Sequence, residues 1–123
     1  MATDLTIQLV NEPGTLLRAS DALGRAGINI EGACGFVCDG HGVYHVLIED
    51  DEAARRALID AGFEIQAERR VSLTAIENRP GAAAAILRRI ADAEVSIDLL
   101  YLTADGRLVL GGEDAVAVQA ALA

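Results

Sequence analysis

The sequence has little positive charge, with 10 basic residues against 19 acidic ones and a net charge of -9. It has no run of Lys and Arg, and aromatic residues make up only 3% of the chain. Such a chain offers nothing that would neutralise phosphates or stack on bases. We therefore do not expect nucleic acid as a partner.

Long apolar runs are also missing. A membrane-spanning helix needs roughly 18 or more consecutive apolar residues, and no stretch of the chain reaches that length. The N-terminus lacks the basic start and apolar segment of a secretory signal. We expect a cytoplasmic protein with no membrane partner.

Cysteine is scarce. Cys34 and Cys38 lie four residues apart in an apparent strand, on one face and about 13 Å apart. Bridged cysteines have Cα atoms about 4.4–6.8 Å apart, so we expect reduced, buried thiols. With His41 and His45 they form a candidate metal site, but the spacing matches no zinc pattern. We expect neither a metal nor a cofactor.

An internal repeat organises the 123 residues, which suffice for one ordinary domain or two very small ones. Asn11–Gly14 (Asn-Glu-Pro-Gly) recurs 67 residues later as Asn78–Gly81 (Asn-Arg-Pro-Gly). The same offset matches apolar with apolar and acidic with acidic residues further on: Leu23 with Ile90, Ala26 with Ala93, Ile28 with Val95, Ile30 with Ile97 and Glu31 with Asp98. We divide the chain into two copies, residues 1–69 and 70–123.

The first copy predicts the order βαββαβ. A strand over 5–10 leads to Pro13, which suits the first turn of a helix, and Gly27 ends that helix as a C-cap. A hairpin over 28–38 and 43–49 follows. Asp50 and Asp51 start a second helix over 52–61, and a fourth strand covers 63–68.

The second copy predicts a strand over 71–76, a helix over 80–93, a hairpin of 95–103 with 108–111, and a helix over 113–122. No residues remain for a fourth strand, so its sheet has three strands or borrows one. Arg69 and Arg70 are expected to interrupt a strand-like run over 63–77. The fold class is α+β, with two ferredoxin-like units, each an antiparallel sheet with both helices on one face.

The strand entering Asn-x-Pro-Gly, the helix start at 14–17 and the helix exit Gly27–Ile30 resemble the ACT domain, an amino-acid-sensing module attached to many biosynthetic enzymes. The likeness covers nearly the whole chain. The second copy, with Glu77 before its turn, resembles the serine-sensing ACT domain of bacterial phosphoglycerate dehydrogenase. Leu9 and Ile76 stand where that form has His, and Ser96 replaces an Asn, so serine is not implied as the ligand.

The resemblance implies an effector site where two units meet side by side, formed by the turn after the first strand and the start of the second strand. The implied ligand-facing positions are Asn11, Glu12, Gly14, Thr15, Leu16, Asn29, Ile30, Asn78, Arg79, Gly81, Ala82, Ser96 and Ile97. A helix start offers unpaired N–H groups and a positive dipole end to a carboxylate. The alternative for Asn11 and Asn78 is a turn or helix-capping side chain.

No nucleophile stands out beside a base, and the acidic run 49–52 is typical of a helix start. We therefore expect no enzyme, but a regulatory protein that binds an amino acid or similar small carboxylate and passes its signal to a partner enzyme. The alternative is a ligand-free interaction module. Because exposed sheet edges and faces need covering, we expect a homodimer.

Overall fold

The computed structural model describes residues 1–123 and contains six strands and four helices in two compact units. One unit comprises Thr3–Arg69, and the other comprises Arg70–Ala123 with Met1–Ala2. Strand β4 (Glu64–Ala75) runs through the boundary without a break. The predicted interruption at Arg69 and Arg70 is wrong, because a strand turns alternate side chains to opposite faces and so carries charged residues without losing its pairing.

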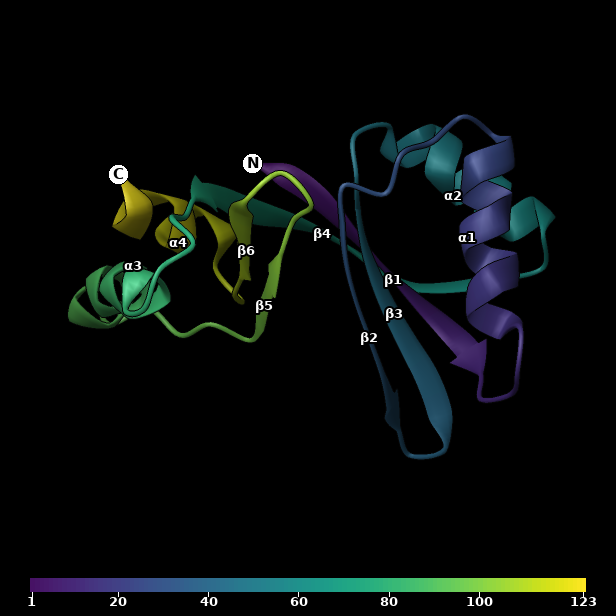
Figure 1. Cartoon of the computed structure of the whole chain (residues 1–123), viewed down its shortest axis with the longest axis horizontal. Coiled ribbons are helices and arrows are strands. Elements are labelled where there is room, and N and C mark those ends of the chain that lie inside the picture. The colour runs from purple at the N-terminus through teal and green to yellow at the C-terminus, as the bar shows by residue number, and fades with distance from the viewer. The chain divides into compact units, whose positions relative to one another are not determined.

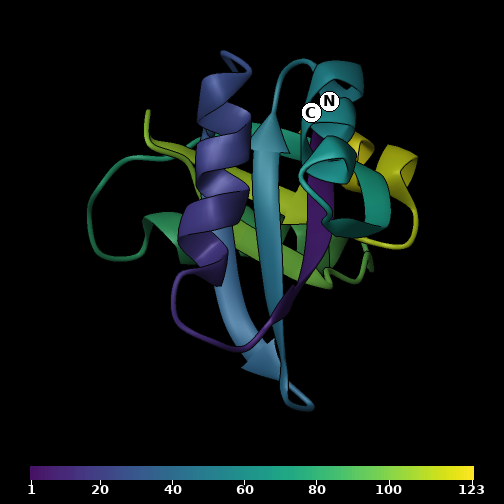
Figure 2. The same cartoon turned by 90° about the vertical axis from the view of Figure 1, so that its right-hand side faces the viewer.

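The unit Thr3–Arg69 is a ferredoxin-like fold. Its strands are β1 (Ala2–Val10), β2 (Gly32–Cys38), β3 (His41–Ile48) and the first part of β4, in the order β2-β3-β1-β4. Helices α1 (Thr15–Arg25) and α2 (Asp51–Asp60) lie on one face of this sheet, as Figures 1 and 2 show. This arrangement confirms the predicted fold class for the first copy.

The core of this unit lies between the sheet and the two helices. Alternation in β1 directs Leu5, Ile7 and Leu9 to the helix side, and all three are buried. From the helices Ala19, Leu23, Ala54 and Leu58 pack against them, with Tyr44, Val46 and Ile48 from β3. Full burial of one such Leu or Ile side chain contributes about 1.5–3 kcal/mol, so this packing fixes both helices on the sheet.

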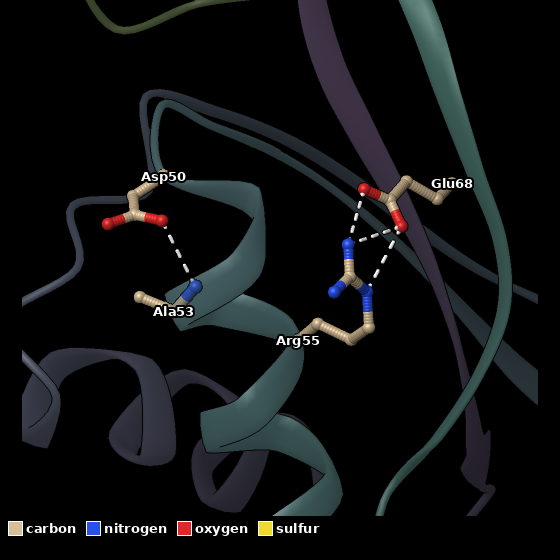
Figure 3. A network of polar contacts seen from close by, with 4 residues as sticks. All are labelled: Asp50, Ala53, Arg55 and Glu68. Atoms are coloured by element: carbon tan, nitrogen blue, oxygen red, sulfur yellow. Dashed lines mark hydrogen bonds and ion pairs between the residues drawn. The ribbon is translucent and has the colours of Figure 1, made fainter.

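Helix α2 begins as the sequence predicts. The Asp50 carboxylate accepts a hydrogen bond of 3.0 Å from the amide of Ala53, which confirms it as the N-cap (Figure 3). Further along α2, Arg55 donates to both carboxylate oxygens of Glu68 on β4, at 2.9 and 3.1 Å. Hydrogen bonding and the charge of Glu68 raise the pKa of Arg55. These contacts tie α2 to the sheet beneath it.

The second unit repeats the arrangement with one strand fewer of its own. The second part of β4, β6 (Arg107–Gly111) and β5 (Leu99–Leu102) follow one another in that order. Helices α3 (Ala82–Asp92) and α4 (Ala115–Leu122) pack together over the core of Ile86, Ile90, Leu108, Leu110 and Val118. The fold class is confirmed here too. In the strand order β1 neighbours β4, and the first residue of β1, Ala2, belongs with Met1 to this unit.

Two element boundaries differ from the sequence prediction in both copies. Helices α1 and α3 start at Thr15 and Ala82, not at the prolines, because Gly14 and Gly81 adopt φ of 90° and 85°, outside the right-handed helical region. Strands β2 and β5 start at Gly32 and Leu99, four residues later than predicted. Between each helix exit and these strands, the apolar residues pack against the core: Ile28 and Ile30 in the first copy, and Val95 and Ile97 in the second.

The exits of α1 and α3 form the same hydrogen-bonded turn. The Ile28 amide donates to the Leu23 carbonyl at 2.9 Å, and Gly27 takes a left-handed φ of 76° just after the C-cap residue Ala26. At the equivalent place the Val95 amide donates to the Ile90 carbonyl at 3.2 Å, but the left-handed residue is Glu94, with φ of 58°.

None of the four helices has the length and apolar character needed to span a membrane.

Replacing Glu94 by Gly is expected to stabilise the protein by about 0.5–1 kcal/mol, because a left-handed conformation strains a residue with a Cβ and costs glycine nothing. The matched variant Gly27→Ala should destabilise by a similar amount. Urea unfolding followed by circular dichroism measures both changes. A destabilised Glu94→Gly variant would contradict the assignment of strain to this residue.

Candidate functional site

The first Asn-x-Pro-Gly turn borders a cavity of about 380 Å³. We call residues Leu9–Leu16, which join β1 to α1, the first corner. The opposite side of the cavity comes from the hairpin of β2 and β3, where the register sets Leu9 opposite Gly42 and Gly42 opposite Val37. The volume lies within the usual range of about 300–1,000 Å³ for small-molecule pockets.

The second turn borders a similar cavity of about 480 Å³. Residues Ile76–Ala84 are the second corner, and its facing wall comes from the hairpin of β5 and β6 through Leu102, Thr103, Ala104 and Gly106. Arg79 donates to Glu77 at 2.6 Å within this corner. Each copy therefore places its turn against its own hairpin around an open space.

The hairpin turn of the second cavity has a polar network of its own. The Thr103 hydroxyl donates to Asp105 at 2.5 Å and accepts from the Arg107 amide at 2.9 Å. Arg107 also donates to Asp105 through its guanidinium at 2.9 Å. The hydrogen bond from Thr103 and then the bond from Arg107 lower the pKa of Asp105. The polar groups at this turn thus already have partners within the chain.

Helices α1 and α3 begin without a side-chain cap, whereas α2 and α4 have one. Asp50 caps α2 at 3.0 Å from the Ala53 amide, and Asp114 caps α4 at 3.0 Å from the Ala117 amide. The N-cap positions of α1 and α3 are the left-handed glycines Gly14 and Gly81, which have no side chain to offer. The capping interpretation of the two asparagines is therefore wrong, because glycine occupies the position whose side chain would face the free amides.

Around the first corner, one buried side chain holds the turn together. Thr15 is 3% exposed, and its hydroxyl donates to the Glu12 carbonyl at 3.0 Å. Asn11, Glu12 and Leu16 are exposed at the rim. In the second corner Ala82 takes the buried place of Thr15, and Asn78 and Arg79 are exposed. The turn residues named from the sequence thus lie together at one cavity in each copy.

The other implied ligand positions lie elsewhere within each unit. Asn29 and Ile30 follow the far end of α1, which at 11 residues is about 16 Å long. Asn29 is exposed in a separate hollow beside α2, and Ile30 packs against the core. Ser96 and Ile97 stand in the equivalent places, with Ile97 packed against the second core. Within one unit, the two halves of the implied site do not meet.

The comparison with protein families agrees with this geometry. A model described as an ACT domain pair matches residues 1–119. The chain belongs to the ACT domain pair family. No curated protein matches it.

Solved structures share the fold of this ACT pair. A protein from Bacteroides thetaiotaomicron superposes with a TM-score of 0.86 and 24% identity, over 98% of this chain and 85% of that one. The regulatory subunit of aspartate kinase from Thermus thermophilus gives a TM-score of 0.71 and 19% identity, over 98% and 89% of the two chains. The corresponding subunit from Thermus flavus gives 0.61 and 18%, over 99% and 92%.

The hairpin side of both ACT cavities was missed by sequence reasoning. Val37, Gly42 and Val43 line the first cavity from β2 and β3, far from the turn in sequence. The signal that could have found them is the antiparallel pairing of β1 with β3, which brings the end of β1 to the start of β3. Val10 lies opposite His41, so the hairpin turn has to lie beside the first corner.

The cysteines and histidines make no metal site. The register sets Cys34 opposite His45 and Cys38 opposite His41 as two separate pairs, and no group of three or more His, Cys, Asp or Glu residues is placed to hold an ion. His45 lies 3.0 Å from the buried carboxylate of Asp4. Both cysteines are free, but Cys34 is only partly buried and Cys38 is exposed. The prediction of buried thiols is therefore wrong, because both lie on the edge strand β2 and Cys38 ends it beside the turn.

Replacing Asp50 or Asp114 by Ala is expected to lower the free energy of unfolding by about 1 kcal/mol each, because each helix loses its N-cap hydrogen bond. In the ligand-free protein, Asn11→Ala and Asn78→Ala should each cost less than about 0.5 kcal/mol, as ordinary surface substitutions do. Urea unfolding curves give all four values. If the asparagine variants lose as much as the aspartate variants, the asparagines do cap the helices.

The Thr103→Val variant is expected to raise the pKa of Asp105, because the hydroxyl that holds it down is removed. The pKa of Asp105 is lower in the folded state than in the unfolded state. The hydrogen bond from Thr103 therefore stabilises the fold at pH values above the unfolded-state pKa, and this stabilisation is lost as the pH falls through the folded-state pKa. Carboxyl carbon chemical shifts recorded against pH report the change. Arg107→Gln should raise the pKa less, and an unchanged midpoint in Thr103→Val would refute the assigned cause.

Proposed function

We propose that this ACT pair is a regulatory protein that binds an amino acid or a similar small carboxylate at its Asn-x-Pro-Gly corners and has no catalytic activity of its own. One observation carries the proposal: the two helix starts at the corner cavities are uncapped, while the two helix starts away from them are capped by aspartates. Membership of the ACT domain pair family supports the regulatory role.

The chemistry of the corners suits a small zwitterion. The backbone amides of Leu16 and Leu17 donate to no carbonyl of the turn, since α1 is first closed by the bond from the Arg18 amide to the Gly14 carbonyl. Such amides, at the positive end of a helix, attract a carboxylate. The Asn11 side chain on the same rim offers both a donor and an acceptor.

The second corner offers the same backbone. The Ala85 amide donates to the Gly81 carbonyl at 3.1 Å, so the amides of Ala83 and Ala84 precede the first closed helical turn. Asn78 takes the place of Asn11 on the rim. Charged-group hydrogen bonds contribute about 1.5–3 kcal/mol each. Two or three of them, reduced by the cost of association, give micromolar to millimolar affinity, which suits a sensor of metabolite levels.

We further propose that Asn29 and Ser96 complete the site of a neighbouring ACT unit, because each lies about a helix length from the corner of its own unit. A homodimer supplies such neighbours. Transmission of the signal then requires a partner enzyme, and the likeness in fold to aspartate kinase regulatory subunits is compatible with this arrangement.

Calorimetric titration of the full chain with each of the twenty amino acids tests the proposal. We expect at least one to bind in the micromolar to millimolar range. At about 100 times its Kd that ligand should stabilise the fold by about 2.7 kcal/mol and raise the Tm accordingly. Asn11→Ala and Asn78→Ala should weaken binding without changing the Tm of the free protein.

Absence of heat and of any Tm shift with all twenty amino acids would overturn the ligand-binding proposal. That result would favour a ligand-free module that holds a partner enzyme or another copy of the chain. Size-exclusion chromatography with light scattering measures the oligomeric state independently, and a monomer at all concentrations would refute the homodimer.

A further inference from the structure

The two corner cavities share a backbone but differ in the side chains at equivalent positions. The repeat offset of 67 residues sets Glu12 against Arg79, Leu16 against Ala83, Gly35 against Leu102 and Val37 against Ala104. All eight residues line their respective cavities. The corners therefore present different chemistry to a ligand.

Charge is the first difference. Glu12 is the single charged residue among those that line the first cavity. The second cavity is lined by Glu77 and Arg79, which form an ion pair at 2.6 Å and neutralise each other. A cation at the first corner thus meets an uncompensated carboxylate, whereas at the second corner it meets a carboxylate that already has a partner.

Apolar bulk is the second difference. Val10, Leu16 and Val37 line the first cavity and are 61%, 53% and 57% exposed, so the rim is apolar. Gly35 and Gly42 line the same cavity and add no side chain to fill it. In the second cavity, Ala83 and Ala104 stand where the first has Leu16 and Val37, Glu77 stands in place of Val10, and Leu102 replaces Gly35. Exposed apolar side chains around a cavity gain free energy when an apolar ligand covers them.

We propose that the first cavity selects L-amino acids with an apolar side chain, with Glu12 accepting hydrogen bonds from the α-ammonium group and Leu16 and Val37 contacting the side chain. This inference rests on the proposed function and adds its specificity. The second corner does not make the same selection, because alanines stand in place of Leu16 and Val37 there and its charges are paired. Glu12 thereby distinguishes an amino acid from the same acid without its amino group.

The experiment compares L-leucine with 4-methylpentanoate, which is the same molecule without the amino group. Titrations are followed by backbone amide NMR of the full chain, and the resonances of Gly14 and Gly81 report the first and second corners separately. We expect L-leucine to bind at the first corner about tenfold more tightly than 4-methylpentanoate, because a charged-group hydrogen bond is gained. In Glu12→Gln this preference should fall to within about twofold.

Two further variants test the apolar contacts. Leu16→Ala and Val37→Ala give the first corner the side chains of the second, and both residues are more than half exposed, so the fold should tolerate them. Each should reduce the preference for L-leucine over L-serine several-fold. The control Glu113→Gln removes an equal charge from an exposed position outside both cavities and should change neither preference.

The outcomes separate this inference from the proposed function. If an amino acid binds but Glu12→Gln weakens L-leucine and 4-methylpentanoate equally, the specificity inference fails and the sensor proposal stands. The same holds if L-leucine shifts only the Gly81 resonance, or if L-serine binds the first corner more tightly than L-leucine. If none of the twenty amino acids binds, both fail.

Discussion

The left-handed glycine at each Asn-x-Pro-Gly corner is the constraint on which the site depends. Gly14 and Gly81 reverse the chain between a strand and a helix with φ of 90° and 85°, a conformation that residues with a Cβ avoid. Because this residue also occupies the N-cap position, the helix starts without a capping side chain. At the two helices where an aspartate occupies that position, its carboxylate accepts a hydrogen bond from one amide of the helix start. The left-handed glycine thus both forms the corner and leaves the helix-start amides without a capping side chain.

Most of the fold could be predicted from the sequence, because its signals are local. Gly27 after a helix, Asp50 before one, and the repeated turn each act through backbone conformation or a contact a few residues away. The predictions failed where tertiary packing decides. Strand β4 continues through Arg69 and Arg70 because pairing along a sheet tolerates charged side chains. Strand β2 starts later than predicted because Ile28 and Ile30 pack on the core.

Of the candidate site, the turn residues could be predicted from the sequence, but the hairpin wall could not. The turn residues are contiguous in sequence and recur in the repeat, so Asn11 and Asn78 stood out. The hairpin wall could not be recognised from local pattern, because Val37 and Gly42 reach the corner through strand pairing across about 30 residues. Ile30 and Ile97 were named as ligand-facing from family resemblance, but an apolar side chain beside a core packs into that core, and within each unit both do so.

Fusion of two copies in one chain removes a restriction that symmetry would impose. A single unit that dimerised about a two-fold axis would carry two identical corners, since every substitution would appear twice. In this chain both corners have the asparagine, the proline and the left-handed glycine, while Glu12 and Arg79 carry opposite charges at equivalent positions. The positions that differ are rim positions, where a change costs little folding free energy. The repeat can therefore preserve the shape of its cavities while their chemistry diverges.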